Sequence, residues 1–436
     1  MTLLLVMSTT FTYVAALILE QARSERIRRA LVVLLVTTLI AILTIFKVPR
    51  EVQDVIRNAI SHPFLNLAMP LGISYYTFKL LSYFIDVYWG TTKAEKRFIP
   101  FLAYVTFFPQ MVAGPIQRSE TFLPQIEGAP RANFRVVLLG VQRILLGFFK
   151  KFVAANNLGI LVNFVFTHMY ATGTPLLLGF YGFTLQLYAD FSGLADIAIG
   201  AAWLLGIASP ENFNAPFAAV NISEYWRRWH ITLTKWLTDY VFTPLRMTVR
   251  QFGNFGLLFS LFVNMVLIGL WHGVRWTYVV FGALHAIYLS IDALTARSRK
   301  RYYKEYPRAD RITNKLGPVV TFHLVVFALL FFRVESVGDG FYYVGHLFSG
   351  LRAVSPEFRT YCYHLGLPML AGFWAYGLAE VGDYFRRRNE TGELVLILPR
   401  WARWSVYTST VTSSLVLLVL VYLAGASSSP FLYAIF

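Results

Sequence analysis

One histidine stands at the end of an apolar segment, where it could act as a base. His272 lies in NMVLIGLWHGVRW (residues 264–276), and Asn264, eight residues earlier, falls close to the same helical face. Gly269 and Gly273 let a second backbone or a narrow ligand come close. A buried neutral imidazole can take a proton from a hydroxyl group. The pattern therefore indicates a general base, and a histidine hydrogen-bonded inside a helix bundle is the alternative.

A second histidine stands among indoles and cations. NISEYWRRWHITLTKW (residues 221–236) surrounds His230 with Trp226, Arg227, Arg228, Trp229, Lys235 and Trp236. If residues 223–240 form one amphipathic helix, Trp226 shares the face of His230 and the cations project to other sides. Cations beside indoles suit a ligand that carries phosphates and a heterocycle. A Trp/Arg belt at the membrane surface, without a ligand, is the alternative.

Other patterns narrow the chemistry. His285 follows His272 by thirteen residues, which in an unbroken helix turns it roughly 220° away, so it is a poor partner for His272. The remaining histidines have no polar company, and we expect them to be structural: His62, His168, His323, His346 and His364. No metal-binding, phosphate-loop or GxSxG spacing occurs in the sequence, so no metal is expected. The single cysteine, Cys362, excludes an internal disulfide.

Two carboxylates lie in the apolar segment YADFSGLADIAIG. Asp190 and Asp196 are six residues apart and would point about 240° apart on a helix, which disfavours a shared proton. An acidic side chain within a membrane is costly unless it faces a wet or paired site. We therefore expect structural or gating carboxylates that are hydrogen-bonded inside the bundle.

The composition indicates a polytopic membrane protein. Of 436 residues, 56% are hydrophobic and 14% are charged, against about 25% charged in a typical soluble protein. The uncharged stretches suggest about 11 embedded helices, some of them short or re-entrant. The net charge of +16 gathers in short loops such as residues 22–30 and 296–315, which favours a cytoplasmic position for both loops over nucleic-acid binding. Residues 1–19 lack a basic start and a cleavage site, so we expect a retained helix.

Residues 1–436 are expected to form a single membrane domain. No linker-like or repeated segment divides the sequence, but three segments depart from plain hydrophobic helix: residues 70–90, 107–125 and 186–246. Backbone groups freed by Pro109 and Pro115 must be satisfied by protein or by water in a cavity. These segments therefore predict a polar interior in the middle of the chain.

Seven motifs in this order resemble the membrane-bound O-acyltransferase family, in its bacterial branch. The resemblance covers about residues 70–336 and includes FFPQMVAGPIQRSETFLPQI, PENFNAPF, SEYWRRWHITLTKWLTDYVFTPLR and LIGLWHGVRWTYVVFGALHAIYL. The sequence is similar to the membrane subunits that O-acetylate alginate or peptidoglycan and, more distantly, to teichoic acid D-alanyl transferases. The resemblance implies an all-α membrane fold, with a ring of helices around a thin central region and a tunnel through it.

The resemblance also implies roles for individual residues. The family's catalytic histidine falls on His272, and its second motif histidine falls on His230. We expect the substrates to be bound by neighbours of these two residues, namely Trp226, Arg227, Arg228, Trp229, Asn264 and Trp271. The segment around His230 would then form the cytoplasmic mouth of the tunnel.

The expected activity is transfer of an acetyl group from cytoplasmic acetyl-CoA to an extracytoplasmic acceptor, for O-acetylation of a surface or cell-wall polysaccharide. Acetyl-CoA is a substrate, and no bound cofactor is expected. The resemblance implies a bacterial cytoplasmic membrane, surrounding lipids and a separate extracytoplasmic partner protein, without nucleic acid. A covalent acetyl-histidine is an alternative to direct transfer. The rival functions are D-alanyl transfer from a carrier protein and a transporter or channel.

Overall fold

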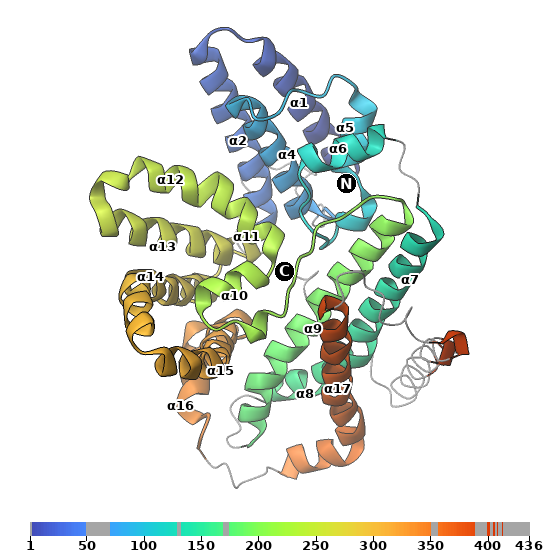
Figure 1. Ribbon diagram of the computed structural model, residues 1–436, viewed down its shortest axis with the longest axis vertical. Coiled ribbons are helices and arrows are strands. Elements are labelled where there is room, and N and C mark those ends of the chain that lie inside the picture. Colours follow the sequence, from blue (N-terminus) through green and yellow to red (C-terminus); the bar gives the residue numbers. More distant parts are fainter. Residues whose placement is uncertain are drawn as a thin grey trace, which may run out of the picture.

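The computed structural model describes residues 2–48, 70–128, 132–168, 174–349 and 356–388, with a few positions between 399 and 412. The regular elements within these residues are all helical (Figure 1). His62 and most of residues 405–436, which are uncharged, lie outside the described residues.

The N-terminal helices are α1 (Thr2–Gln21), α2 (Glu25–Lys47), α4 (Ile73–Trp89), α5 (Phe98–Val105) and α6 (Ser119–Glu127). The middle of the chain forms α7 (Phe134–Phe148), a π-helical turn (Phe149–Ala155), α8 (Asn156–Thr167) and α9 (Thr174–Leu204). The motif-bearing part forms α10 (Ile222–Arg228), α11 (Ile231–Leu237), a π-helical turn (Thr238–Phe242), α12 (Thr243–Thr248) and α13 (Gly253–His272). The last helices are α14 (Trp276–Glu305), α15 (Pro307–Arg333), α16 (Val337–His346) and α17 (Pro356–Arg388).

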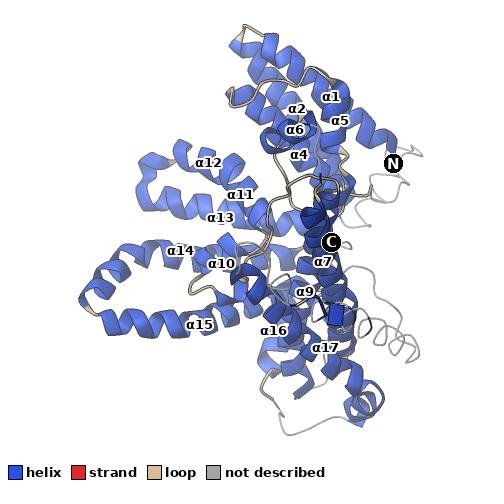
Figure 2. Cartoon of the chain, turned by 45° about the vertical axis from the view of Figure 1, so that its right-hand side comes forward, coloured by secondary structure: helices blue, strands red, loops and turns tan. Residues whose placement is uncertain are grey.

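The helices surround a centre that is crossed by the loop before α10 and by the short helices α10 and α11 (Figure 1). Turned by 45°, the molecule shows the α12–α13 and α14–α15 hairpins projecting on the same side (Figure 2). Helical segments in α1, α2, α13, α14 and α15 are long and apolar enough to cross a membrane. The all-helical membrane architecture is therefore confirmed, whereas the helix number of about 11 and the tunnel stay predictions.

Helices α7 and α9 pack backbone against backbone through paired glycines. A Cβ atom on Gly147 would lie 2.5 Å from the carbonyl oxygen of Gly193, and one on Gly200 would lie 2.6 Å from that of Gly140. Small residues of this kind let membrane helices approach closely where no hydrophobic force between them is available. The contact makes α7 and α9 a rigid pair.

Buried ion pairs join the same two helices to α17. Lys150, in the π-helical turn after α7, donates to Asp196 of α9 and to Asp383 of α17, each at 2.6 Å. Arg143 donates to the other oxygen of Asp196 at 2.9 Å, and Lys151 donates to Asp190 at 2.6 Å. Asp190 and Asp196 therefore bind different cations, and the predicted hydrogen bonding of both carboxylates inside the bundle is confirmed.

Replacing Lys150 with methionine is expected to destabilise the protein by about 3 kcal/mol or more, because the change leaves two buried carboxylates without their shared ammonium group. Thermal unfolding of the purified variant, followed by tryptophan fluorescence in detergent, measures the loss. The double variant Lys150→Met/Asp383→Asn removes one of the two carboxylate charges and should recover part of the lost stability. Unfolding of Lys150→Met at the parent temperature would show that the network contributes little.

Candidate active site

The segment that carries His230 is a broken helix. One continuous helix over residues 223–240, the condition under which Trp226 would share the face of His230, is not formed: α10 ends at Arg228, and α11 begins at Ile231. His230 lies between them with a φ angle of +43°, in the left-handed region that residues other than glycine seldom occupy. Such backbone strain persists only where the surroundings fix it.

Asn212 fixes this break from a neighbouring loop. Its backbone carbonyl accepts from the N–H of Ile231 at 2.9 Å, and the N–H of Asn214 donates to the carbonyl of Arg228 at 2.9 Å. The side-chain oxygen of Asn212 accepts from the hydroxyl of Thr232 at 2.9 Å and from its N–H at 3.3 Å. The loop therefore supplies partners at the break, where the helical hydrogen bonds are interrupted.

The same Asn212 oxygen sets the protonation of His230. Nδ1 of His230 lies 3.1 Å from it, and an amide oxygen only accepts, so Nδ1 carries the proton. The backbone N–H of Thr232, also bound there, identifies the atom as oxygen and not nitrogen. Nε2 of the neutral ring then keeps a lone pair that can accept a proton.

His230 and His272 meet at one indole ring. Trp271 lies between them in the ring contacts, 4.5 Å from His272 and 5.9 Å from His230 between ring centres. His272 is the last residue of α13, and its ring also packs on Phe332 of α15 at 4.7 Å. His230 is buried, whereas His272 is partly exposed. Two histidines from separate segments therefore share one site.

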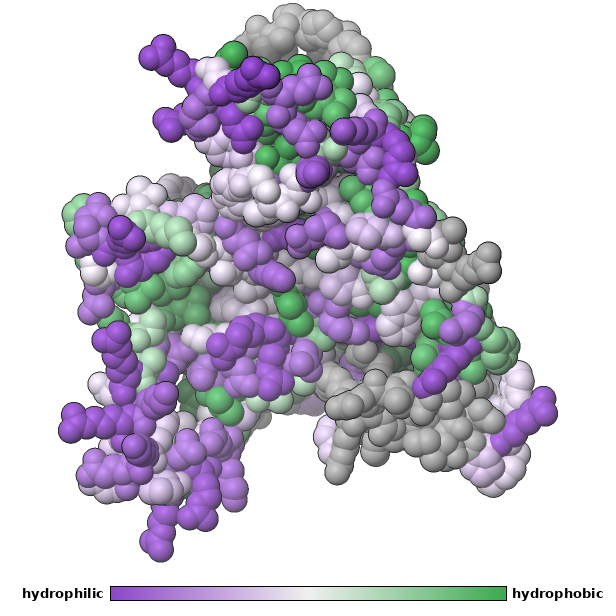
Figure 3. All heavy atoms as spheres, turned by 45° about the horizontal axis from the view of Figure 1, so that its top comes forward, coloured by the Kyte–Doolittle hydropathy of each residue, from purple (hydrophilic) through white to green (hydrophobic). Residues whose placement is uncertain are grey.

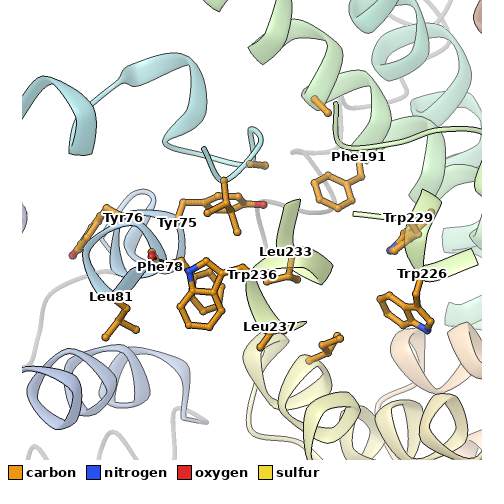
Figure 4. Packing of buried hydrophobic residues seen from close by; sticks show 14 of the residues in the cluster. Tyr75, Tyr76, Phe78, Leu81, Phe191, Trp226, Trp229, Leu233, Trp236 and Leu237 are labelled. Carbon is orange, nitrogen blue, oxygen red and sulfur yellow. Dashed lines mark hydrogen bonds between the residues drawn. The ribbon is translucent and has the colours of Figure 1, made fainter. Parts of the chain in front are cut away.

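Aromatic residues of α4 form another wall of this site. Phe78 contacts both Trp271, at 5.7 Å, and Trp236 of α11, at 4.5 Å. The indole N–H of Trp236 donates to the carbonyl of Phe78 at 3.0 Å, which ties α11 to α4. Figure 4 shows Phe78 against Trp236, with Phe191 and Trp229 on the far side of α11.

The broken segment predicted at residues 107–125 lines the interior through buried amides. Gln110 Nε2 donates to Gln117 Oε1 at 2.7 Å, and Gln110 Oε1 accepts from the buried ammonium of Lys79 at 3.1 Å. The N–H of Ile116 donates to the Thr232 hydroxyl at 3.0 Å, next to the Asn212 oxygen. The expected polar interior is present here as a hydrogen-bonded network.

The predicted ligand-binding indoles are packed inside the protein. Trp226 and Trp229 are buried, Trp229 stacks on Tyr225 at 5.7 Å, and Trp226 donates to Nδ1 of His285 at 3.3 Å. The two arginines differ from each other. Arg228 pairs with Glu224 at 2.6 Å, whereas Arg227 is exposed. A role for these four residues in substrate binding stays a prediction.

Asn264 is buried on α13, about two helical turns before His272. Eight residues separate it from His272 on α13, or about 12 Å along the helix axis, so the two side chains do not share one ligand atom. Its side-chain oxygen has no hydrogen-bond partner among the described residues.

Three of the histidines that were expected to be structural lie outside this site. In each, Nδ1 is hydrogen-bonded to the backbone carbonyl four residues earlier in the same helix, namely in His168, His323 and His346.

No role for Asn212, Lys79 or Gln110 follows from the sequence alone. Asn212 stands in PENFNAPF, where the two flanking prolines indicate a loop held close to other backbone, but the partner of its side chain lies 18 to 20 residues away. Only the folded chain brings these groups together.

The sequence matches a known protein family and several groups of known proteins. The model of the membrane-bound O-acyltransferase family matches residues 96–331. A probable alginate O-acetylase of Pseudomonas aeruginosa is 37% identical over 293 residues, covering 66% of this chain and 53% of that protein. A peptidoglycan O-acetyltransferase of Helicobacter pylori is 30% identical over 369 residues, covering 77% and 67%.

A teichoic acid D-alanyltransferase of Bacillus subtilis is also similar, with 34% identity over 288 residues that cover 62% of this chain and 70% of that protein. The chain spans about half the length of several alginate O-acetylases that it matches. The family match includes the Asn212 loop, the broken helix and the segment that ends at His272. The chain therefore belongs to the membrane-bound O-acyltransferase family.

Proposed function

We propose that the protein transfers an acetyl group from cytoplasmic acetyl-CoA to an extracytoplasmic hydroxyl acceptor, for O-acetylation of a surface or cell-wall polysaccharide. The observation that carries this proposal is the meeting of two motif histidines at Trp271, inside a membrane-embedded centre. Relatives named as alginate O-acetylases and peptidoglycan O-acetyltransferases supply the class of acyl group. A separate extracytoplasmic protein would complete the delivery.

His272 is the general base in this proposal. It takes the proton of the acceptor hydroxyl while that oxygen attacks the thioester carbonyl, and the thiolate of CoA leaves and is protonated. The position of His272 at the end of α13, where the residue is partly exposed, supports this role, because a base must reach the atom whose proton it removes. His230 is buried, and its Nδ1–H donates to the Asn212 side-chain oxygen. Nε2 is then the ring atom suited to hydrogen-bond a substrate.

The donor enters beside α10. The N–H of Ser223 donates to Asp292 at 3.3 Å, and Asp292 pairs with Arg299 at the start of the basic segment 296–315. Positive residues near membrane helices favour the cytoplasm, so the start of α10 belongs to that side. Arg227, exposed on α10, is then placed for the phosphates of CoA.

D-alanyl transfer from a carrier protein is the second candidate, because the Bacillus subtilis relative has a similar level of identity. In that case the exposed surface of α10 would contact the carrier and not a free nucleotide. Labelled acetyl-CoA tests the choice directly, since a carrier-dependent enzyme leaves it unconsumed.

Replacing His272 with alanine is expected to lower the transfer rate by roughly 10² to 10⁴, the usual loss of a general base. The unfolding temperature should stay near that of the parent, because His272 is a partly exposed residue at the end of α13. Transfer from radiolabelled acetyl-CoA and thermal unfolding on the same preparation test both statements. Activity within a few-fold of the parent would remove His272 from the mechanism.

Two replacements of His230 separate chemistry from backbone strain. Asparagine tolerates the left-handed conformation, whereas alanine there costs about 1 kcal/mol or more. His230→Asn should therefore unfold near the parent temperature but transfer acetyl groups slowly, and His230→Ala should lose both stability and activity. Parent-like transfer by His230→Asn would show that this position serves the fold alone.

Arg227→Gln and Arg228→Gln form a matched pair. Arg227→Gln should raise KM for acetyl-CoA more than it lowers kcat, because contacts to a remote phosphate act as uniform binding. Added salt should reproduce part of the effect by screening over about 8 to 10 Å. Arg228→Gln should lower the free energy of unfolding by about 0.5 kcal/mol through loss of the Glu224 pair. If KM is unchanged in both variants, the phosphates bind elsewhere or the donor is a carrier protein.

A further inference from the structure

Helices α13 and α14 touch at one end and diverge at the other. Near His272 they are in backbone contact, since a Cβ atom on Gly269 would lie 2.1 Å from the carbonyl of Tyr278 and one on Gly282 would lie 2.5 Å from that of Met265. Toward the start of α13 the facing residues are large, and the two helices separate (Figure 2). The small residues therefore allow the close backbone contact at this end of the pair.

An apolar groove of about 350 Å³ occupies the diverging end. It is lined from α13 by Phe255, Leu258, Phe259 and Phe262, and from α14 by Ala286, Ile287, Ser290, Ile291 and Leu294. Its volume lies within the range of about 300 to 1,000 Å³ that is usual for ligand sites. Both helices belong to the segments that can cross a membrane, so the groove opens to lipid.

Two arginines continue the groove along α14. Arg297 follows Ser290 by seven residues, and Arg301 follows Leu294 by seven, which is two helical turns, so both lie on the groove face. Arg299 lies on the opposite face, where it pairs with the buried Asp292. Arg297 and Arg301 are exposed and have no ion pair or hydrogen bond among the described residues.

The arginines lie at the depth of the lipid headgroups. Twenty-one residues separate Trp276 from Arg297 on the continuous helix α14, or about 31 Å, close to the roughly 30 Å of a bilayer's hydrocarbon core. Trp276, exposed at the other end, is a residue typical of the opposite interface. The helices α12 to α15 lie on the left of Figure 1 and also on the left of Figure 3. Figure 3 shows hydrophobic surface there, with hydrophilic side chains gathered above and below it.

We propose that the α13–α14 groove binds one anionic phospholipid of the cytoplasmic leaflet, with an acyl chain along the phenylalanines and the phosphate on Arg297 and Arg301. Apolar length and paired positive charge at headgroup depth match the two chemical parts of such a lipid. The bound chain would fill the space between the diverging helices and so support α13, which ends at His272.

Native mass spectrometry of the detergent-purified full chain tests this proposal with added dioleoyl phosphatidylglycerol, and with dioleoyl phosphatidylcholine as the uncharged comparison. One phosphatidylglycerol is expected to be retained in preference to phosphatidylcholine. The variant Arg297→Gln/Arg301→Gln should bind it roughly 30-fold more weakly, from about 1 kcal/mol for each cation. Ser290→Phe, which fills the groove and leaves both arginines, should also release it.

Arg308→Gln/Arg311→Gln is the matched control, because it removes the same charge from the neighbouring helix α15. This control should bind phosphatidylglycerol like the parent. Equal loss in the control would reduce the effect to general attraction by the basic segment and overturn the site. Full retention of phosphatidylglycerol by Arg297→Gln/Arg301→Gln would also overturn the proposal. So would a thermal-unfolding measurement in which glycerol 3-phosphate, which has no acyl chains, raises the unfolding temperature as much as phosphatidylglycerol does.

Discussion

The side-chain oxygen of Asn212 holds together the helix break around which the centre is built. It accepts hydrogen bonds from both polar hydrogens of Thr232 and from Nδ1 of His230, across an interruption that would otherwise leave backbone groups unsatisfied inside a membrane. The strained backbone at His230 depends on this acceptor. Without the break, α10 and α11 would be one helix, and the position of His230 relative to Trp271 would change.

The rest of the centre supports that loop. Asn212 lines a water-sized cavity together with Arg143 and Asp196, so the buried ion network of α7, α9 and α17 lies directly behind the site. The glycine contacts between α7 and α9 hold these charges in place. From the other side, the amides of the segment after α5 reach Thr232 through Ile116. Long membrane helices therefore form the frame of the centre, and short hydrogen-bonded segments position His230 within it.

The sequence predicted the parts of this arrangement that follow from local pattern. Apolar stretches predicted membrane helices, prolines predicted a buried irregular segment, and motif resemblance predicted the family. It did not predict the break at His230, because the residues around it are compatible with a helix and the deciding acceptor, Asn212, lies 18 residues earlier. The burial of Trp226 depends in the same way on His285, whose position follows from the turn between α13 and α14.

The central claim is that the broken helix delivers His230 into the same catalytic unit as His272. A double-mutant cycle on acetyl transfer, with His230→Asn, His272→Ala and the double variant, tests this claim most directly. Residues that act as one unit give strongly non-additive losses. We therefore expect the double variant to transfer acetyl groups within a few-fold of the slower single variant. If the fold-loss in transfer rate of the double variant equals the product of the two single fold-losses, the two histidines act independently. That result would contradict the account.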